Sequence, residues 1–221
     1  DARINRNEVD ILKNLNHMYL PQVVDFFEEN GEIYTAMSFI PGRSLKELME
    51  ERRQFSQRQL IRWAMQLCSA LNYLHTQTPP IIHGDIKPAN IMVTPRGDVC
   101  LIDFNVSFAV NGNTVLGYTE GYASPEQYII ALDSREGREL PQYRVIDEKS
   151  DIYSTGATLF HLITGKKAGR NRTKAEEYLL KNYVSEAFAA VILKAMDPKS
   201  EKRYKNAREM FQALQNVYKK D

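Results

Sequence analysis

The chain has 221 residues, of which 43% are hydrophobic, enough to build an ordinary core in one large domain or two small lobes. Its formal net charge is +1, so no bulk charge favours nucleic acid or a membrane surface, and no apolar run reaches the roughly 20 residues of a membrane span. We therefore expect a cytoplasmic chain with no nucleic-acid partner and no membrane segment.

The first forty residues are predicted to form one helix and two strands. Residues 23–27 and 32–39 are β-prone and flank the turn signal Glu29-Asn30-Gly31, which indicates a hairpin. Pro41-Gly42 then breaks the pattern. An amphipathic helix that ends near Asn16 is indicated before the hairpin by apolar residues at helical spacing, namely Ile4, Ile11, Leu12 and Leu15.

Two capping boxes follow, Ser44 with Glu47 and Ser56 with Gln59. In such a box the hydroxyl and the side chain three residues later each satisfy a free amide at the start of a helix. The second helix should run to about His75, because one apolar stripe continues along it: Leu60, Ala64, Leu67, Cys68, Leu71 and Leu74. The two cysteines, Cys68 and Cys100, lie in apolar runs without metal-ligand spacing, and we expect reduced core thiols.

The second half of the chain is predicted to be mainly helical after one more hairpin. Residues 91–94 and 99–102 are β-prone and flank the turn Pro95-Arg96-Gly97-Asp98. The polar stretch 129–149 is expected to be an exposed loop. Helices are predicted at 152–164, closed by Gly165, at 186–196 and at 206–218.

Polar side chains gather between the long helix and the second hairpin. They are His83, Asp85, Lys87 and Asn90, and Asp103 follows the second strand of the hairpin. Phosphoryl transfer needs such a set, because one carboxylate accepts the proton of the acceptor hydroxyl while Asp and Asn oxygens hold Mg²⁺. A lysine can neutralise the charge that moves with the phosphoryl group.

An ordered series of motifs then resembles the eukaryotic-type protein kinase family, in the serine/threonine branch found in bacteria. The series is HxDxKxxN from His83, Asp-Phe at 103, Ser-Pro-Glu at 124, Asp-Ile-Tyr-Ser-Thr-Gly at 151 and a late Arg, and the match runs from Glu8 nearly to the end. The resemblance implies an α+β, protein-kinase-like fold, with a remnant N-lobe in residues 1–40 and a mainly helical C-lobe in 41–221. It also implies an enzyme that uses ATP and Mg²⁺ to phosphorylate a protein Ser or Thr.

The family's catalytic roles carry over onto the matching positions. By this resemblance Asp85 is the catalytic base, Lys87 touches the γ-phosphate, and Asn90 and Asp103 are metal ligands. Thr119 would shape the acceptor pocket. The adenine slot would be lined at the hinge and beneath the base by Met37, Ser38, Phe39 and Met92.

The remaining matches imply structural roles. Glu126 would pair with Arg203, and Asp151 would pin the backbone of the loop that carries Asp85. His83 and Phe104 resemble members of a stacked spine that also includes Leu12 and Val23, and Glu8 resembles the glutamate of the αC helix. For His83 in particular, packing is the expected role rather than chemistry.

Two departures from the family pattern concern loop control. Gly84 stands where the family usually has an Arg that binds a phosphorylated activation loop, so we expect that loop phosphorylation is not the switch. Asn105 replaces the Gly of Asp-Phe-Gly, and Asn tolerates a left-handed turn better than other side chains. Asp103 is therefore still expected to hold metal.

The third departure lies before Glu8. The sequence has no room there for the Gly-rich strand pair or for the Val-Ala-Ile-Lys strand, and we expect the natural N-terminus to lie upstream of Asp1. Both upper contacts to ATP would then be missing, so the chain as it stands is expected to be nearly inactive. The two remaining strands would keep an open edge and an exposed apolar face, which predicts self-association through the remnant N-lobe.

Three functions stay open on the sequence. The chain is a piece of a serine/threonine kinase that is active when intact, a naturally shortened pseudokinase that serves as a binding scaffold, or a small-molecule phosphotransferase. The last class often has His-Gly-Asp, which is weak alone because an Asp in a Gly- and Pro-rich loop is more often a turn former. It usually lacks the equivalents of Lys87, Glu126 and Arg203, so these residues distinguish the classes.

Overall fold

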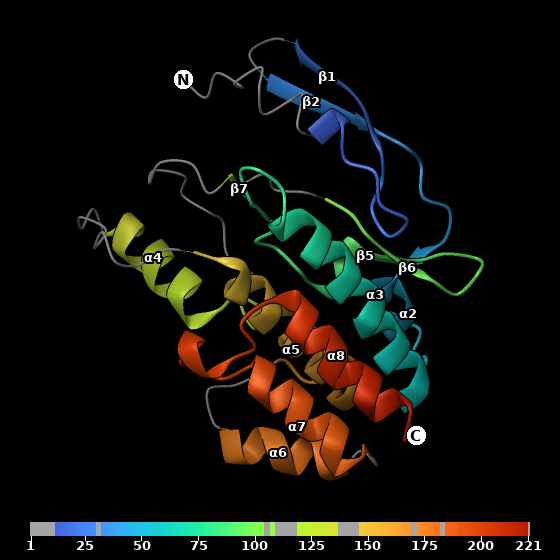
Figure 1. The fold of residues 1–221 in the computed structure, drawn as a ribbon, viewed down its shortest axis with the longest axis vertical. Coiled ribbons are helices and arrows are strands. Elements are labelled where there is room, and N and C mark those ends of the chain that lie inside the picture. The colour runs from blue at the N-terminus through green and yellow to red at the C-terminus, as the bar shows by residue number, and fades with distance from the viewer. Residues whose placement is uncertain are drawn as a thin grey trace.

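The computed structural model describes residues 12–29, 32–103, 107–108, 119–136, 146–168, 172–181 and 184–220. Figure 1 shows a small hairpin near the N-terminus, set above a larger helical body that contains the C-terminus. Within the described ranges, no helix is long and apolar enough to cross a membrane.

The upper part is an antiparallel hairpin of β1 (Val23–Glu29) and β2 (Glu32–Met37), with a register irregularity between Val23 and Asp25. This confirms the predicted hairpin, although β2 ends two residues earlier than expected and the turn at 30–31 lies outside the described residues. Phe27 and Tyr34 stack on each other across the strands and are both about half exposed. The predicted helix before the hairpin is described only from Leu12 onward, where residues 12–13 are helical.

Two helices open the lower body, and both start at a serine. At α2 (Leu45–Glu50) the predicted capping box is complete, because Ser44 accepts from the Glu47 amide and the Glu47 carboxylate accepts from the Ser44 amide. At α3 (Gln57–His75) the Ser56 hydroxyl caps the Gln59 amide, but the side chain of Gln59 makes no return bond. The second box is therefore a simple N-cap rather than the reciprocal pair that the sequence predicted.

Helix α3 is the centre of the core. It packs against α8 (Ala207–Tyr218), α5 (Glu148–Thr164) and strand β6 (Val99–Leu101). Its Trp63, the one tryptophan of the chain, is 2% exposed and donates from its indole nitrogen to the Gly97 carbonyl over 2.9 Å. Helix α3 thus anchors the turn that joins β5 (Ile91–Val93) to β6.

Small sheets hold the loops that carry the polar residues. Strand β5 lies between β3 (Arg43–Ser44) and β6 in a three-stranded sheet, and β4 (Ile81–Ile82) pairs with β7 (Ser107–Phe108). Between β4 and β5 the chain makes a loop that ends in the short helix η1 (Pro88–Asn90). We call residues 83–90 the polar loop.

The polar stretch 129–149 is not the loop that the sequence predicted. Helix α4 (Pro125–Arg135) fills its first part, and α5 already begins at Glu148. Helix α4 begins with Pro125 at its first position and with a capping box. Only three residues of α4 are buried, so the sequence gave little periodic signal there. Residues 137–145 lie outside the described residues.

The last third of the chain is helical, as predicted, with one addition. Helices α7 (Glu186–Ala195) and α8 confirm the two predicted helices, with the short helix η2 (Ser200–Lys202) between them. Helix α6 (Arg172–Lys181) was not predicted, because it is polar on most sides. The two cysteines are free and buried, as expected, and burial raises the pKa of each thiol to about 12.

Helices α5 and α7 approach closely at Gly156. A Cβ atom built there would lie 2.9 Å from the Ala195 Cβ and 2.9 Å from the Met196 Cγ. Real side chains do not approach that closely, so the glycine permits the helix contact.

Replacing Gly156 with alanine is expected to lower the free energy of unfolding by about 1–3 kcal/mol, the usual cost of overpacking. Helix propensity alone predicts the opposite sign, a gain of about 0.5–1 kcal/mol. Urea denaturation measures the difference in the free energy of unfolding. The control is Ala190→Gly on the exposed side of α7, which makes the reverse change and reports the propensity effect alone. An unchanged or higher stability of Gly156→Ala would contradict the close contact.

Candidate active site

The polar loop brings three predicted residues together around the Asp85 carboxylate. One carboxylate oxygen accepts from the Thr119 hydroxyl over 2.7 Å, and the other accepts from the Lys87 ammonium over 2.6 Å and from the Asn90 amide over 3.2 Å. Lys87 also donates to the Thr119 oxygen over 3.1 Å. A carboxylate, an ammonium group, an amide and a hydroxyl thus meet at one point, although Thr119 lies 34 residues further along the chain.

Asn90 is held in one orientation. Its side chain is buried, and its amide nitrogen donates both to the Asp85 carbonyl, over 2.9 Å, and to the Asp85 carboxylate. Its carbonyl oxygen accepts no hydrogen bond within the described part of the chain. That oxygen therefore stays available as a ligand.

Asp103 follows β6 and is exposed, with a positive φ of 63°. Few side chains adopt that left-handed backbone, and Asp is among those that tolerate it. Strained conformations of this kind cluster at functional sites, because the surrounding structure must maintain them. The Asp103 carboxylate forms no hydrogen bond or ion pair with other described residues, so it too is available as a ligand.

Asp103 and Asn90 fit what Mg²⁺ requires from a protein. The ion binds oxygen ligands, keeps several waters, and is usually held by one or two carboxylates together with the phosphates of a substrate. One exposed carboxylate and one fixed amide oxygen match that pattern.

Asp151, in the first turn of α5, lies against the backbone of the polar loop. It is fully buried, and its carboxylate accepts from the His83 amide over 2.9 Å and from the Gly84 amide over 2.8 Å. Nε2 of His75 lies 2.9 Å from the same carboxylate. Burial raises the pKa of Asp151, but these hydrogen bonds and the nearby histidines outweigh burial, so its pKa lies below the usual value.

His75 is a residue of this site that the sequence did not single out beyond ending a helix. Its other ring nitrogen, Nδ1, is buried without a partner among the described residues. Since its partner is 76 residues away in the chain, no local pattern could have indicated the contact.

His83 packs inside the loop. It is fully buried, and burial lowers the pKa of its ring despite the opposing charge of Asp151. Nε2 lies 3.1 Å from the Ile102 carbonyl, and Nδ1 lies 3.3 Å from the Asp85 amide. A neutral ring that donates from Nε2 and accepts at Nδ1 satisfies both contacts.

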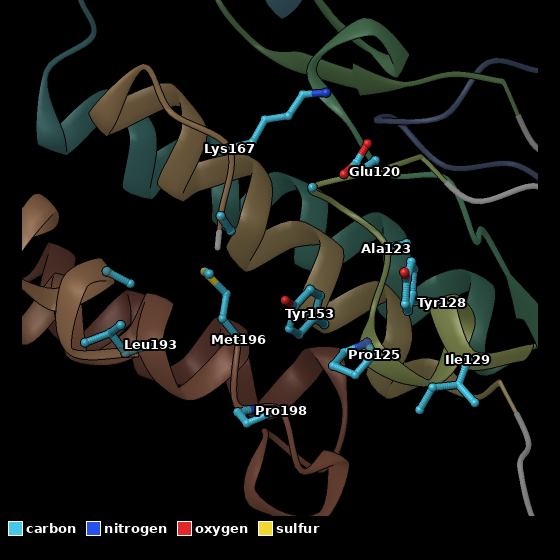
Figure 2. Close-up of a pocket in the computed structure, with 13 residues that line it drawn as sticks. Glu120, Ala123, Pro125, Tyr128, Ile129, Tyr153, Lys167, Leu193, Met196 and Pro198 are labelled. Carbon is cyan, nitrogen blue, oxygen red and sulfur yellow. The ribbon is translucent and has the colours of Figure 1, made fainter. Parts of the chain in front are cut away.

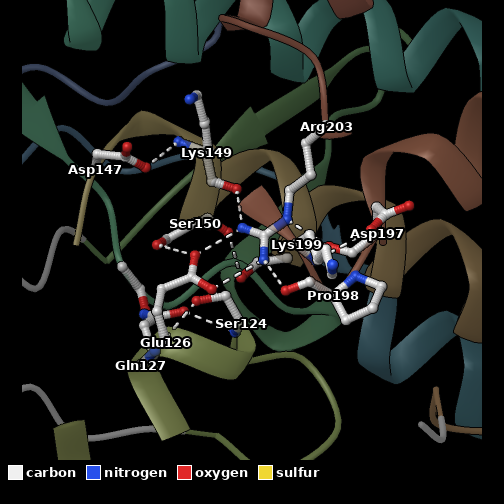
Figure 3. Close-up of polar contacts among 12 residues, drawn as sticks. Ser124, Glu126, Gln127, Asp147, Lys149, Ser150, Asp197, Pro198, Lys199 and Arg203 are labelled. Carbon is white, nitrogen blue, oxygen red and sulfur yellow. Dashed lines mark hydrogen bonds and ion pairs between the residues drawn. The ribbon is translucent and has the colours of Figure 1, made fainter. Parts of the chain in front are cut away.

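Glu126 and Arg203 form a buried, bidentate ion pair (Figure 3). The two N···O distances are 2.6 and 2.9 Å, and the Arg203 side chain is fully buried. Arg203 also donates to the backbone carbonyls of Asp197 and Lys149, while the Ser150 hydroxyl donates to Glu126. The pair therefore joins the start of α4 to α5 and to the segment before α8.

The predicted adenine residues lie at the end of β2 and on β5. Phe39 is 87% exposed, and Met37 is exposed as well. The backbone amide of Ser38 donates to the Gln22 carbonyl, which ties the segment to the chain before β1. Met92 is half-buried on β5.

The predicted spine is described in part. Leu12 and Val23 are buried together with His83. Glu8, Phe104 and Asn105 lie outside the described residues.

A pocket of about 780 Å³ lies next to the segment that follows Thr119. It is bounded by the segment that follows Thr119 and by α4, α5, α6 and α7. Figure 2 shows the charged side chains of Lys167 and Glu120 at one end, and Leu193 and Met196 on the opposite side. The pocket is thus mixed in character, and none of the residues around the Asp85 carboxylate lines it.

Comparison with known proteins agrees with this geometry. The family model described as protein kinase domain matches residues 2–221. A probable serine/threonine-protein kinase of Clostridium acetobutylicum is 28% identical over 96% of the chain and 33% of its own length. The chain spans 13% to 35% of the length of curated relatives such as this one.

Solved structures show the same fold. The kinase domain of Mycobacterium tuberculosis PknI has a TM-score of 0.72 at 20% identity, covering 96% of the chain and 77% of that structure. Rad53 in complex with AMP-PNP has a TM-score of 0.72 at 21% identity, covering 96% of the chain and 54% of that structure. The predicted α+β, protein-kinase-like fold is therefore confirmed.

Replacing Glu126 with glutamine is expected to lower the free energy of unfolding by about 3–5 kcal/mol at pH 7, because it leaves the buried Arg203 charge unpaired. Burial raises the pKa of Glu126, but the hydrogen bonds and charge of Arg203 outweigh burial and hold it below its ordinary value of 4.5. The pair thus contributes fully above about pH 4.5, and its contribution is lost as the pH falls through the lowered pKa.

Denaturation curves between pH 3 and 7 measure this effect. The wild-type protein should lose stability in acid more steeply than Glu126→Gln, which no longer carries that carboxylate. Glu201→Gln, at an exposed carboxylate two residues from Arg203, is the control and should behave as wild type. Equal acid sensitivity of wild type and Glu126→Gln would contradict the role of the pair.

Proposed function

The chain belongs to the protein kinase family, and on that premise we propose that the protein transfers the γ-phosphoryl group of ATP to a serine or threonine hydroxyl of a protein substrate. One observation carries the proposal: Asp85, Lys87 and Thr119 contact one another within 3.1 Å. The arrangement provides a proton acceptor and a positive charge at the same point, as phosphoryl transfer requires.

In the proposed reaction Asp85 is the base. An acceptor hydroxyl would donate to its carboxylate from the side on which the Thr119 hydroxyl now donates, and would pass its proton to that carboxylate as the phosphoryl group arrives. General-base catalysis of this kind typically contributes about 10²–10⁴-fold. Lys87, already bound to the same carboxylate, would hold a γ-phosphate oxygen and neutralise its charge.

We propose Asn90 and Asp103 as the Mg²⁺ ligands, since each has an unused oxygen and Asp103 follows Ile102, whose amide donates to the backbone carbonyl of Asn90. Bound ATP would supply the phosphoryl group, and the Mg²⁺ ion would offset the negative charge of the phosphates. Met37, Ser38, Phe39 and Met92 are the proposed adenine contacts; the nucleotide analogue in the Rad53 complex supports a nucleotide in this fold. The predicted low activity of the chain by itself stays a prediction, so the assays below use the whole protein.

Two of the distinguishing residues support a protein kinase rather than a small-molecule phosphotransferase. Glu126 and Arg203 form the ion pair that holds the start of α4, the helix that follows the segment with Thr119. The third, Lys87, bridges Asp85 and Thr119. The mixed pocket beside Thr119 offers a surface on which the flank of a protein substrate can rest.

We retain three sequence-based proposals about partners and location. Nucleic acid is not expected as a partner, and a cytoplasmic location fits the absence of bulk charge and of an apolar run. The exposed faces of Phe27 and Tyr34 on the hairpin are where self-association would occur. Sedimentation of the whole protein tests that last proposal.

Replacing Asp85 with asparagine is expected to lower kcat by at least about 100-fold, because the amide cannot accept the proton. The affinity for ATP should change little, since the base does not hold the nucleotide. Radiolabelled phosphate transfer to a protein substrate measures kcat, and calorimetry measures binding. Glu176→Gln, at an exposed carboxylate of α6, serves as the control. Undiminished turnover of Asp85→Asn would refute the assignment.

Mg·ATP is expected to raise the melting temperature of the whole protein by several degrees, because a ligand at 100 times its Kd stabilises by about 2.7 kcal/mol. Asp103→Asn should reduce this shift, since the amide is a weaker Mg²⁺ ligand, while the melting temperature without nucleotide should change little. Absence of any shift in the wild-type protein would favour the alternative of a binding scaffold.

A further inference from the structure

We propose that Gln127 is a positioning residue for Asp85, acting through a hydrogen bond from its side-chain amide to the backbone of the polar loop. The inference rests on the proposed function, because it assumes that Asp85 is the base. Neither the sequence motifs nor the ion pair of Glu126 accounts for this side chain, although it is only 2% exposed.

Both ends of the Gln127 amide are used. Its oxygen accepts from the Ser124 amide over 2.9 Å and completes the capping box of α4. Its nitrogen donates to the Gly84 carbonyl over 2.8 Å, a contact between residues 43 positions apart in the chain. In Figure 3, Gln127 lies beside Ser124 and Glu126 at the start of α4.

The cap alone does not require an amide. In the capping box of α2 the same position is Glu47, whose carboxylate accepts from the Ser44 amide over 2.7 Å. Either Glu or Gln satisfies a capping box, but only Gln can also donate. The feature that separates Gln127 from Glu47 is thus the donor that reaches Gly84.

The Gly84 carbonyl belongs to the peptide unit that leads directly into Asp85. Because a peptide unit is planar, fixing this carbonyl also fixes the amide of Asp85. Gly84 has a φ of 78° and, as a glycine, the freest backbone of any residue. The orientation of Asp85 therefore depends on the hydrogen bonds that hold the two peptide units of Gly84.

These two units are held from different elements. Asp151 of α5 accepts from the Gly84 amide, whereas Gln127 of α4 donates to the Gly84 carbonyl. Without Gln127 the second unit keeps, among the residues that the structure describes, the 3.3 Å contact between the Asp85 amide and His83. The hydrogen bond from Gln127 is thus the shorter of the two contacts that hold the peptide unit between Gly84 and Asp85.

Gln127 also couples the base to the acceptor side of the site. Thr119 contacts the carboxylate of Asp85, and Gln127, eight positions later in the same segment, contacts the backbone beside it. One segment thus holds Asp85 at both its side chain and its backbone. A shift of that segment would move the base as well.

The test is Gln127→Glu in the whole protein. The carboxylate keeps the shape and the cap but faces the Gly84 carbonyl with an acceptor, so the polar loop should shift. A misplacement of about 1 Å costs about 100-fold in rate, so we expect kcat to fall by about 10- to 100-fold, with the KM values for ATP and for the protein substrate within twofold of wild type.

Gln59→Glu is the matched control, because it makes the same change at the same position of the α3 cap, where the side chain is exposed and makes no return bond. It should leave kcat unchanged. Gln127→Leu, which removes the donor without adding charge, should lower kcat in the same way and serves if the carboxylate variant does not fold.

Amide hydrogen exchange at residues 83–86 gives a readout that does not need activity. Faster exchange there in Gln127→Glu, but not in Gln59→Glu, is the expected result. If wild-type protein transfers no phosphate, the proposed function fails while this comparison still tests the contact with Gly84. Equal exchange and equal kcat in Gln127→Glu and Gln59→Glu would overturn the inference.

Discussion

The site depends on the hydrogen bonds that the buried carboxylate of Asp151 accepts. A charge without water is costly unless donors surround it, and here two backbone amides of the polar loop and a histidine ring do so. The first turn of α5 adds a favourable helix dipole. Because the donors are the amides of His83 and Gly84, satisfying Asp151 fixes the loop at the same time. The core thus holds the polar loop from outside, in addition to the contact of Asn90 with the Asp85 carbonyl within the loop.

A second buried charge extends this support to α4. The ion pair of Glu126 and Arg203 ties the start of α4 to α5 and to the segment before α8, while Gln127 points the other way, to the polar loop. The segment with Thr119 leads directly into α4. The contacts at the start of α4 therefore fix the end of the segment that follows Thr119, and Thr119 itself contacts Asp85. Two networks of buried polar groups thus define the place where the proposed chemistry occurs.

Sequence reasoning succeeded where the signal was local. The hairpin, the caps at Ser44 and Ser56 and the long helix α3 follow from short-range patterns, and Asp85, Lys87 and Asn90 meet because only a few residues separate them. Helices α4 and α6 were missed, since a narrow apolar face gives no clear period. Thr119 was indicated only by family resemblance. The contacts of His75 and Gln127 span 76 and 43 positions, and no pattern within one element encodes them.

Trp63 gives the molecule a built-in optical reporter. The single indole of the chain is enclosed between α3 and the turn of the β5–β6 hairpin, edge-on to Phe55 and hydrogen-bonded to the Gly97 carbonyl. Its fluorescence therefore arises from one known environment, next to the turn that joins β5 to β6. Loosening of this hairpin changes the polarity around the indole, so emission from one side chain follows the state of the scaffold without any added label.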